Sequence, residues 1–442
     1  MLSCTRASAN ERRERIKQET GGKKIDVSTF HQLGRRIITN CESNRPSICS
    51  QSLLEELIKK KVDSRELDRY VELTGQDRDS VIRLLTTVIT LMKSKGYSLD
   101  DLEKRIQEGN PINKKSNMYV FQLLAPVYQA YQTHLTETNT MDFNDMIWRA
   151  IRLIQNGRYL HSYKYVIVDE YQDMSYAPDV LLHTMRQTND FRLFCVGDDW
   201  QSIYRFNGSD IGYILEFEKY WGPAQISKIE TTYRFSQQLV NISGSFIMKN
   251  RRQYQKKMLG KGTGCAGFAL GLIRDNLYRN AIDKMITKFG ELPIGSTVFV
   301  LGRYKSDKDV LKHFPNLCVI EKPDGEAAIE YQERPDLKIS FLTVHKSKGL
   351  QADFVFIINN RKGKTGFPSQ YQDPPIIGLL LNAREAYPFA EERRLFYVAL
   401  TRAKKKVYLV IQNDNVSEFA KELMCEYGNE INGRSLAGEE FA

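Results

Sequence analysis

Long apolar runs, paired cysteines and clustered histidines are all missing from this 442-residue sequence. Stretches such as Phe354–Ile358 fall far short of the ~18–20 apolar residues that a membrane-spanning helix needs. The first residues, MLSCTRASANERRER, contain no apolar core of the kind that defines a secretory signal. The seven cysteines include no C-x-x-C pair, and no histidine stands at ligand spacing from them. We therefore expect reduced thiols in a cytoplasmic protein, without a membrane span or a structural zinc site.

What the sequence does contain is the composition of a folded globular chain, with 41% hydrophobic and 27% charged residues. At roughly 150 residues per domain, the length predicts about three structural units. Lysine and arginine (64) outnumber aspartate and glutamate (54), which leaves a net charge of +10. This excess is compatible with a polyanionic partner such as nucleic acid, but charge alone is weak evidence for one.

Strand-like and helix-like patterns alternate along the chain. Short β-branched or aromatic runs typical of buried strands occur at 165–168, 193–196, 297–301, 340–343, 354–358 and 407–411. Apolar residues at helical spacing predict helices at 52–61, 79–92, 99–108, 120–135 and 143–155. Strands separated by helices imply parallel sheets that bind ligands at the carboxyl ends of their strands. We expect two such sheets, before and after about residue 230.

The sharpest chemical signal is the sequence KYVIVDEYQD at 164–173. A buried strand ends there in two adjacent carboxylates, Asp169 and Glu170. ATP hydrolysis needs such a pair, because one carboxylate can lie near Mg²⁺ while the other orients or deprotonates a water molecule. A lone acidic pair is more simply explained as solvated. The apolar residues before this pair and Gln172-Asp173 after it favour the catalytic interpretation.

A second strand ends in a polar turn at FCVGDDWQSIYRFNG, residues 194–208. The amide of Gln201 is suited to sensing a γ-phosphate. Tyr204 and Phe206 follow at i, i+2 spacing, and two exposed aromatics there can stack on unpaired bases. The alternative is that both rings are ordinary core aromatics, which their position directly after a polar turn disfavours.

These motifs and several others resemble those of superfamily 1 DNA helicases of the UvrD/Rep type, and most of all the helicase IV branch, which Trp200 favours. The matches stand in the family's order and cover nearly the whole chain. They are SCTRASANERRERI (3–16, motif Ia), STFHQL (28–33, motif Ib), MDFNDMI (141–147), VIVDEYQD (166–173, Walker B), VGDDWQSIYRF (196–206, motif III), TTYRFSQQLVN (231–241, motif IV), FLTVHKSKGLQADFV (341–355, motif V) and EERRLFYVALTRA (391–403, motif VI).

The resemblance implies an α/β fold with two RecA-like, P-loop NTPase-type domains, each built on a parallel sheet, and a helical insertion in the first. The expected ranges are 1–40 and 119–230 for the first domain, 41–118 for the helical insertion, 231–415 for the second domain and 416–442 for a C-terminal tail. Between motifs IV and V the chain is short, so we expect a small α/β segment in place of the large accessory domain of many relatives.

The resemblance also assigns nucleotide-binding roles, with ATP as the nucleotide and Mg²⁺ held by Asp169. Arg234 and Arg402 match arginines that reach the γ-phosphate from the second domain, a role that suits a planar and permanently charged guanidinium. Either arginine alone would be more simply explained as a surface ion pair. Tyr233 matches the aromatic that stacks on adenine, and Gly349 and Gln351 match nucleotide-binding positions, with Gln351 replacing a common ribose-contacting glutamate.

Single-stranded DNA and duplex junctions are the partners that the resemblance implies, together with repair or replication proteins. Hydroxyl and imidazole side chains can donate hydrogen bonds to phosphates without reading sequence, which suits a translocase. The resemblance implies that the translocase moves 3′ to 5′. A structural role in the fold is the alternative for His345. The positions that match the family's DNA track are Thr5, Thr29, Phe30, His31, Thr343 and His345, in addition to Tyr204 and Phe206.

One motif of the family is absent: no G-x-x-x-x-G-K-[ST] occurs in the sequence. The string Gly363-Lys364-Thr365 has Ile358 where the first glycine should stand, and it follows motif V. In the family this phosphate loop precedes motif Ia, which here begins within the first residues. We therefore expect the chain to be truncated at its amino end and, as given, to lack ATPase and helicase turnover. Loss of the loop's strand would also leave sheet-edge groups without ladder partners.

The first interpretation is thus an ATP-dependent DNA helicase. The second is a different class of protein, a non-catalytic remnant that binds single-stranded DNA, or a gene fragment. A third, a nuclease with Asp169, Glu170 and Asp198 as metal ligands, is disfavoured because no further acidic or histidine cluster supports a two-metal site. The nuclease hypothesis would also leave the arginine motifs unexplained.

Overall fold

The computed structural model describes residues 1–3, 6–21, 25–50, 52–62, 64–262, 269–323, 325–381 and 385–432. The chain forms two compact units. Unit 1 contains Met1–Asp198, Tyr204–Tyr220 and Asp373–Arg384, and unit 2 contains Asp199–Ile203, Trp221–Gln372 and Glu385–Ala442. Residues 199–203 therefore belong to unit 2, although the stretches before and after them belong to unit 1. Residues 373–384 belong to unit 1, although the stretches before and after them belong to unit 2.

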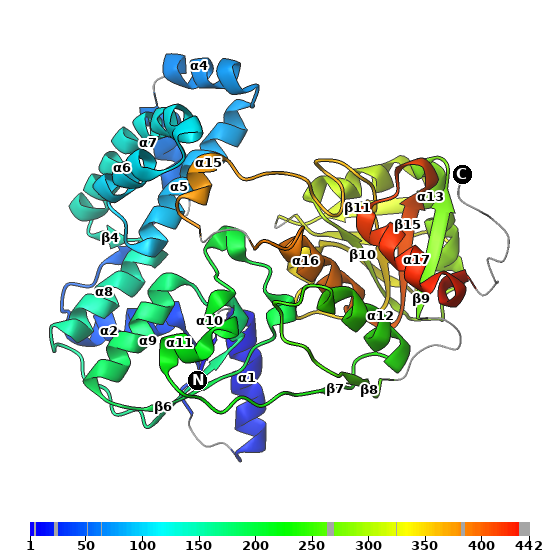
Figure 1. The fold of residues 1–442 in the computed structure, drawn as a ribbon, viewed down its shortest axis with the longest axis horizontal. Helices are drawn as coiled ribbons and strands as arrows, with labels where there is room; N and C mark the ends of the chain where they lie inside the picture. Colours follow the sequence, from blue (N-terminus) through cyan, green and yellow to red (C-terminus); the bar gives the residue numbers. More distant parts are fainter. Residues whose placement is uncertain are drawn as a thin grey trace. The chain divides into compact units, whose positions relative to one another are not determined.

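Unit 1 contains a parallel sheet of four strands in the order β2-β1-β5-β6. The strands are β1 (Leu2–Ser3), β2 (Ser28–Thr29), β5 (Tyr165–Asp169) and β6 (Arg192–Cys195). The predicted strands at 165–168 and 193–196 are thereby confirmed, and they pair in register with Ile167 opposite Phe194. Helices α2 (Phe30–Cys41), α8 (Phe143–Gln155) and α9 (Tyr176–Thr188) pack in sequence beside one another, α2 on α8 and α8 on α9. Helix α1 (Arg6–Glu19) follows β1 directly (Figure 1).

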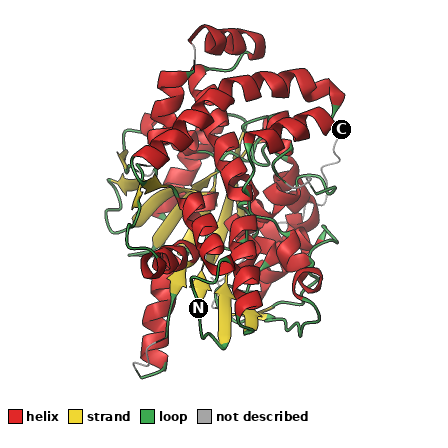
Figure 2. Ribbon diagram, turned by 90° about the vertical axis from the view of Figure 1, so that its left-hand side faces the viewer, coloured by secondary structure: helices red, strands yellow, loops and turns green. Residues whose placement is uncertain are grey.

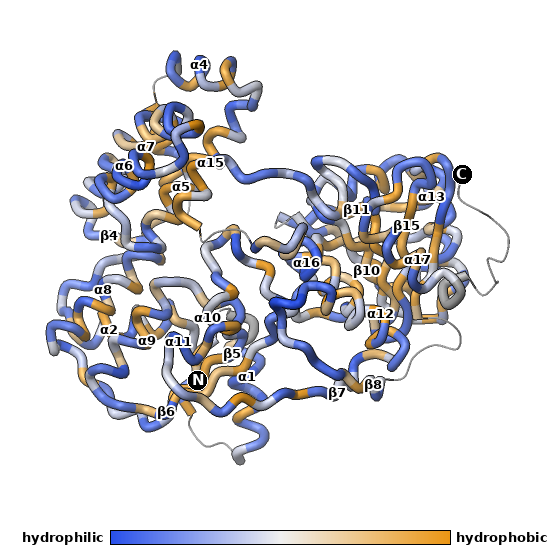
Figure 3. Tube along the Cα trace, viewed as in Figure 1, coloured by the Kyte–Doolittle hydropathy of each residue, from blue (hydrophilic) through white to orange (hydrophobic). Residues whose placement is uncertain are grey.

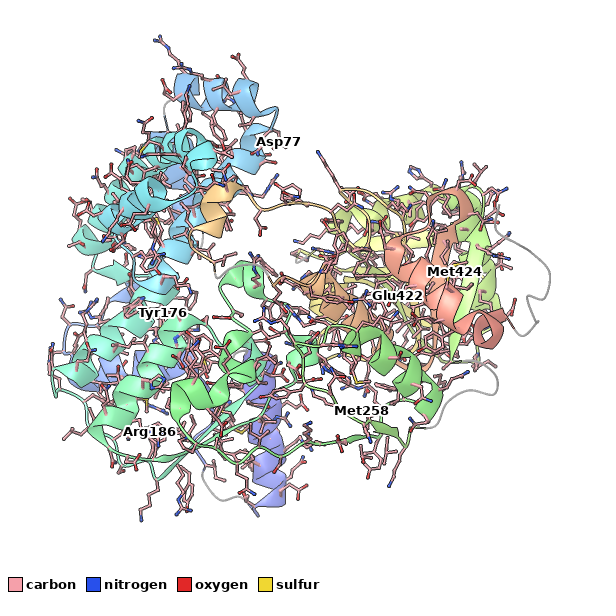
Figure 4. All side chains as sticks on the ribbon, viewed as in Figure 1. Asp77, Tyr176, Arg186, Met258, Glu422 and Met424 are labelled. Carbon is pink, nitrogen blue, oxygen red and sulfur yellow. The ribbon has the colours of Figure 1, made fainter. Side chains whose placement is uncertain are left out.

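A helical block completes most of unit 1. It consists of α3 (Leu53–Lys61), α4 (Ser64–Thr74), α5 (Arg78–Lys95), α6 (Leu99–Glu108) and α7 (Pro111–Glu137). Two of the helix starts have a local cause: Asp77, labelled in Figure 4, accepts a hydrogen bond from the Ser80 amide at the start of α5, and Asn110 caps α7 ahead of Pro111. The apolar stripes of these helices form one core, visible as the orange stretches of α5 and α7 in Figure 3.

Helix α7 is longer than its apolar pattern predicts, because it begins at Pro111 and runs unbroken to Glu137. It thus passes through the expected domain boundary at residue 118. The same block receives α15 (Pro375–Gly378), a short helix from far along the chain, which contacts α5 and α7 (Figure 1).

Unit 2 is built on a seven-stranded sheet in the order β11-β12-β13-β10-β14-β15-β9. The parallel strands are β9 (Leu270–Asp275), β10 (Thr297–Gly302), β13 (Lys338–Thr343), β14 (Ala352–Ile357) and β15 (Ala403–Gln412). Strands β10, β13, β14 and β15 confirm the strands predicted in the second half of the sequence, whereas β9 was not predicted. At one edge the sheet also contains antiparallel pairs, because β12 (Ala327–Tyr331) runs antiparallel to both β11 (Leu317–Glu321) and β13. The connection from Glu321 to Ala327 is short, and a short connection can join only antiparallel strands, because neighbouring parallel strands need a longer crossover.

Helices α12 (Gln237–Met248), α13 (Tyr278–Gly290), α16 (Ala390–Leu400) and α17 (Glu418–Asn432) complete unit 2. Helix α13 packs on β9 and β15, and α12 contacts both α16 and α17. In Figure 2 the helices are red and the strands of the sheets yellow. Glu422 of α17, labelled in Figure 4, holds Arg393 of α16 in an ion pair of 2.7 Å.

The remaining elements are short. They are β3 (Ser47–Ile48) paired with β4 (Thr140–Met141), β7 (Thr231–Thr232) paired with β8 (Leu259–Gly260), and the helices α10 (Gly212–Leu215), α11 (Phe217–Trp221) and α14 (Val344–Ser347). Among the helices of the described residues, none combines the length and the apolar character that crossing a bilayer requires.

A buried carboxyl group stands out in unit 1. The side chain of Asp179 on α9 is almost fully buried, and its Oδ1 has no hydrogen-bond partner among the residues that the structure describes. Its Oδ2 lies 3.6 Å from Nε2 of His183, one helical turn further on. Burial raises the pKa of Asp179 to about 7, so that the carboxyl is protonated in the folded protein well above its ordinary range.

We predict that Asp179→Asn stabilises the protein at pH 8 and has little effect at pH 4. Between an unfolded pKa of ~3.9 and the folded pKa, the folded state binds more protons, so the parent loses stability as pH rises through this window. The variant has no carboxyl group at this position, so its free energy of unfolding does not fall in this way. The expected difference at pH 8 is roughly 2–4 kcal/mol, at ~1.4 kcal/mol per pKa unit. Urea unfolding between pH 4 and 8 measures it, with Asp190→Asn as an exposed control; a pH-independent difference would contradict the assignment.

Candidate functional site

The carboxylates predicted to work on ATP lie at the carboxyl end of β5. Asp169 is the last residue of the strand, and Glu170 follows with a left-handed φ of 55°, a conformation that costs energy in a residue with a Cβ. Glu170 Oε2 accepts a hydrogen bond of 2.6 Å from Gln172 Nε2. The fully buried Gln172 accepts in turn, through Oε1, from the backbone amide of Asp198 at 2.9 Å. One amide side chain therefore links the turns that follow β5 and β6.

Gly197 shows how closely these two turns approach each other. A Cβ at this position would lie 2.7 Å from Gln172 Oε1 and 3.0 Å from the Gln172 backbone nitrogen. Because real Cβ atoms do not come so close to other atoms, only glycine fits without moving Gln172. The glycine of the Gly-Asp-Asp turn thus has a steric role.

Asp169 is buried and carries a cation as a neighbour. Arg12 Nε of α1 lies 2.7 Å from Asp169 Oδ2. Carboxylate oxygens are the ligands that Mg²⁺ prefers, but Oδ2 of Asp169 is already engaged by Arg12. Within the described part of the chain, no group of three or more histidine, cysteine, aspartate or glutamate side chains could hold a metal ion. That Asp169 would hold Mg²⁺ therefore stays a prediction.

Two aromatic side chains of unit 1 follow the β6 turn. Phe206 is 47% exposed, as the sequence predicts. Tyr204 is only half-buried rather than fully exposed, and its ring meets that of Phe206 edge-on with centroids 6.1 Å apart. Burial, with the charges of Asp173 and Glu170, raises the pKa of the Tyr204 phenol to about 12. The hydroxyl is therefore neutral and lies within electrostatic range of the acidic turn.

The predicted DNA-track residues at the start of α2 have clear structural roles. The Thr29 side chain accepts a hydrogen bond from the Gln32 amide and forms a capping box with it. Phe30 is buried in the core, while the ring of His31 packs edge-on against Phe143 at 5.3 Å. Thr5 lies outside the described residues.

In unit 2 the structure brings two predicted phosphate-sensing groups together. Arg402 Nη2 lies 3.5 Å from Gln201 Oε1, although the two residues are far apart in sequence. The guanidinium is 1% exposed and also donates to the carbonyl oxygens of Val398 and Leu350, at 2.9 and 3.4 Å. Lys348 Nζ donates to the Gln201 carbonyl at 2.9 Å.

The motif V positions that were predicted to bind nucleotide, Gly349 and Gln351, lie next to Leu350 in the chain, the residue whose carbonyl contacts Arg402. Gly349 has a φ of +84°, which a glycine adopts without strain, and Leu350 next to it accepts from Arg402. Gln351 follows, exposed, just before β14. The turn of Gly349 and Gln351 therefore lies beside Arg402 within unit 2.

Tyr233 and Arg234 follow β7. Tyr233 is 73% exposed, with Lys261 Nζ 5.9 Å from its ring centroid, so a ring face is available for stacking. The Arg234 amide donates to Thr232 Oγ1 at 3.3 Å, a local turn contact.

Thr343 and His345 stand at the carboxyl end of β13, where Thr343 begins α14. Burial lowers the pKa of His345 to about 3, with the charges of Arg303 and Lys348 adding to the effect. The imidazole is therefore neutral near pH 7 and would act toward DNA as a hydrogen-bonding group rather than as a cation.

Several residues that contact the site were not assigned roles from the sequence. Gln172 and Lys348 lie inside the motif strings, so their polar character there was an available signal, whereas Arg12 carries no signal because α1 is rich in arginine. Arg394 of α16 donates through Nε to the Ser202 carbonyl at 2.6 Å.

Comparison with known proteins now adds to this geometry. The sequence model of the UvrD/REP helicase N-terminal domain matches residues 1–221, and that of the UvrD-like helicase C-terminal domain matches residues 303–414. DNA helicase IV of Escherichia coli is 29% identical over 96% of this chain and 63% of its own length. ATP-dependent DNA helicase Rep of Buchnera aphidicola is 28% identical over 76% of this chain and 51% of its own length.

ATP-dependent DNA helicase UvrD1 of Mycobacterium leprae is 30% identical over 63% of this chain and 37% of its own length. The chain thus spans less than two thirds of the length of these curated relatives. Among solved structures, "The structure of PRRSV helicase" aligns with a TM-score of 0.26 at 15% identity over 56% of this chain and 34% of that one, which is too low to bear on the fold.

The α/β fold with parallel sheets agrees with these matches. Because the first family model alone covers half of the 442 residues and the second matches a separate stretch, the chain belongs to the UvrD/Rep family of DNA helicases.

Proposed function

We propose that the chain provides the two-domain framework of an ATP-dependent DNA helicase that moves 3′ to 5′ on single-stranded DNA. The contact of Gln201 Oε1 with Arg402 Nη2 at 3.5 Å is the observation that carries the proposal. It joins a residue after the β6 turn to one after α16, and a γ-phosphate sensor needs this combination of amide and guanidinium.

Each predicted residue has a chemical role in ATP hydrolysis under this proposal. Asp169 would hold Mg²⁺, which when bound would neutralise negative charge on the phosphates. Glu170 takes the proton of the water that attacks the γ-phosphorus, while the bond to the bridging oxygen breaks. Arg234 and Arg402 stabilise charge on the transferring phosphoryl group. The adenine stacks on Tyr233, and the turn of Gly349 and Gln351 contacts the ribose.

For the DNA we propose a track lined by hydroxyl, imidazole and aromatic side chains. Phe206 is the best supported stacking group because it is exposed. Duplex junctions, repair or replication proteins as partners, and the cytoplasm as the compartment follow from the same proposal. The proposal also includes the absence of structural zinc and the expected domain ranges. These are 1–40 with 119–230 for the first domain, 41–118 for the helical insertion, 231–415 for the second domain and 416–442 for the tail. The residues of the proposed track are Thr5, Thr29, Phe30, His31, Tyr204, Phe206, Thr343 and His345.

We further propose that these 442 residues alone do not turn over ATP, because they contain no G-x-x-x-x-G-K-[ST] phosphate loop. The unit 1 sheet supports this proposal. Strand β6 forms an edge of the described sheet, and alternate residues on one face of β5 and β6 are exposed. Both faces of a parallel sheet are normally covered, so a further strand and helix would fit beside β6. The exposed apolar side chains are Tyr165, Ile167, Phe194 and Val196.

A non-catalytic protein that binds single-stranded DNA, or a gene fragment, remains the second candidate, and the missing loop motif is the observation that favours it. An in-frame phosphate-loop sequence in the genomic DNA directly upstream would favour the helicase. Its absence there would favour the second candidate.

We predict that the purified 442-residue chain shows no DNA-stimulated ATP hydrolysis above that of its own Glu170→Gln variant. The physical reason is that backbone amides and a lysine of the phosphate loop are needed to hold the β- and γ-phosphates. A phosphate-release assay with and without oligo-dT measures this, with a loop-containing member of the family as the positive control. DNA-stimulated release that disappears in Glu170→Gln would refute the prediction.

We predict that Phe206→Ala weakens binding of a fluorescent oligo-dT by roughly 5- to 100-fold, as expected for the loss of ~1–3 kcal/mol of base stacking. The slope of affinity against salt concentration should stay the same, because no phosphate contact is lost. Fluorescence anisotropy measures both quantities. The matched control is Tyr165→Ala, an exposed aromatic at the opposite end of β5. Equal affinities of Phe206→Ala and the parent would exclude stacking on this ring.

A further inference from the structure

The segment 199–203, here named the Gln201 segment, is anchored deeply in unit 2. Trp200 is 1% exposed, donates through Nε1 to the Tyr254 carbonyl at 3.0 Å and packs edge-on against Tyr397. Met258, labelled in Figure 4, packs against the same cluster. Asp199 is fully buried, with Lys256 Nζ 2.7 Å from its Oδ1. Hydrophobic and ionic contacts thus both hold this segment.

The segment 373–384, here named the strap, does the reverse, because it belongs to unit 1 while its flanks belong to unit 2. Its helix α15 lies against the helical block (Figure 1). Asp373 at its start forms an ion pair of 3.0 Å with Arg205, which follows the Gln201 segment closely in sequence. The strap side chains that are buried in the core of the helical block are Ile376, Ile377, Leu380 and Leu381.

Arg394 connects the two segments within unit 2. Its guanidinium is 1% exposed, donates through Nε to the Ser202 carbonyl at 2.6 Å and pairs through Nη2 with Glu385 Oε1 at 2.6 Å. Glu385 is the first residue after the strap, and Asn250 Nδ2 lies 3.5 Å from its other oxygen. The buried Arg394 guanidinium therefore contacts both the Gln201 segment and Glu385, the residue that directly follows the strap.

Two stretches of chain, around residues 202–205 and 373–385, are thus joined twice. In unit 1, Arg205 pairs with Asp373, and in unit 2, Arg394 contacts both Ser202 and Glu385. A charge buried this completely is costly to leave without its partner, so the contacts of Arg394 are expected to persist or to be lost together.

We propose that Arg394 is a positioning residue that sets the place of Gln201 and makes it depend on the strap. The helical block, through α15 and Glu385, then biases the segment that presents Gln201 to Arg402. The part of this inference that concerns nucleotide sensing rests on the proposed function. The mechanical linkage itself does not, and it is tested without nucleotide or DNA.

The test uses Trp200 as the reporter. The variant Trp148→Phe/Trp221→Phe leaves Trp200 as the single tryptophan of the full chain, and acrylamide quenching reports its access to solvent. In this background, Arg394→Met removes both contacts while keeping an apolar side chain of similar length. We expect its quenching constant to rise at least threefold. Glu385→Gln, which keeps the shape but removes the charge, should raise it by a smaller factor and serves if Arg394→Met does not fold.

The decisive variant is Leu380→Ala, which loosens the strap in unit 1 and lies on a different element from Trp200. We expect it to raise quenching of Trp200 at least twofold, and the double variant with Arg394→Met to exceed Arg394→Met alone by little, since both break one linkage. The matched control is Ile58→Ala, which removes the same kind of buried side chain from the same core but from α3. It should leave quenching at the parent value.

Circular dichroism confirms that each variant is folded before quenching is compared. Unchanged quenching in both Leu380→Ala and Glu385→Gln would overturn the linkage. Equal increases in Leu380→Ala and Ile58→Ala would overturn it as well, because the effect would then be general loosening of the helical block. Failure of the ATP-hydrolysis or DNA-binding experiments would leave these outcomes unaffected.

Discussion

Parallel pairing of β5 with β6 is the constraint on which the unit 1 site depends. Parallel strands end at the same edge of a sheet, so the turn after Asp169 and the turn after Cys195 must lie side by side. Gln172 then joins them, accepting from the Asp198 amide and donating to Glu170. The glycine requirement at 197 follows from this close approach.

In unit 2, buried arginines connect segments that are far apart in the sequence. Arg402 and Arg394 come from one helix and the turn that ends it, and each is almost completely buried. Arginine suits this position because its several donors diverge from a planar group, so that one side chain can satisfy acceptors on different elements. Arg402 reaches Val398, Leu350 and Gln201 in this way, and Arg394 reaches Ser202 and Glu385.

Much of the fold was predictable because its signals are local. The runs that became β10 and β14 are apolar and rich in β-branched or aromatic residues, which marks strands buried on both faces. The antiparallel hairpin of β11 and β12 was not predicted, because its exposed alternate residues weaken the pattern. Thr29 and Phe30 show the limit for site residues, since capping and core packing explain them without any ligand.

The sequence by itself determined the family, the order of the motifs and which residue types are available for phosphate chemistry, because motifs are contiguous strings and strand or helix patterns repeat over short distances. Only the tertiary structure decided that residues 199–203 and 373–384 fold into the unit opposite to their neighbours, and that Arg394 joins them. The physical reason is that such contacts depend on burial and direction in space, which leave no periodic trace along the chain.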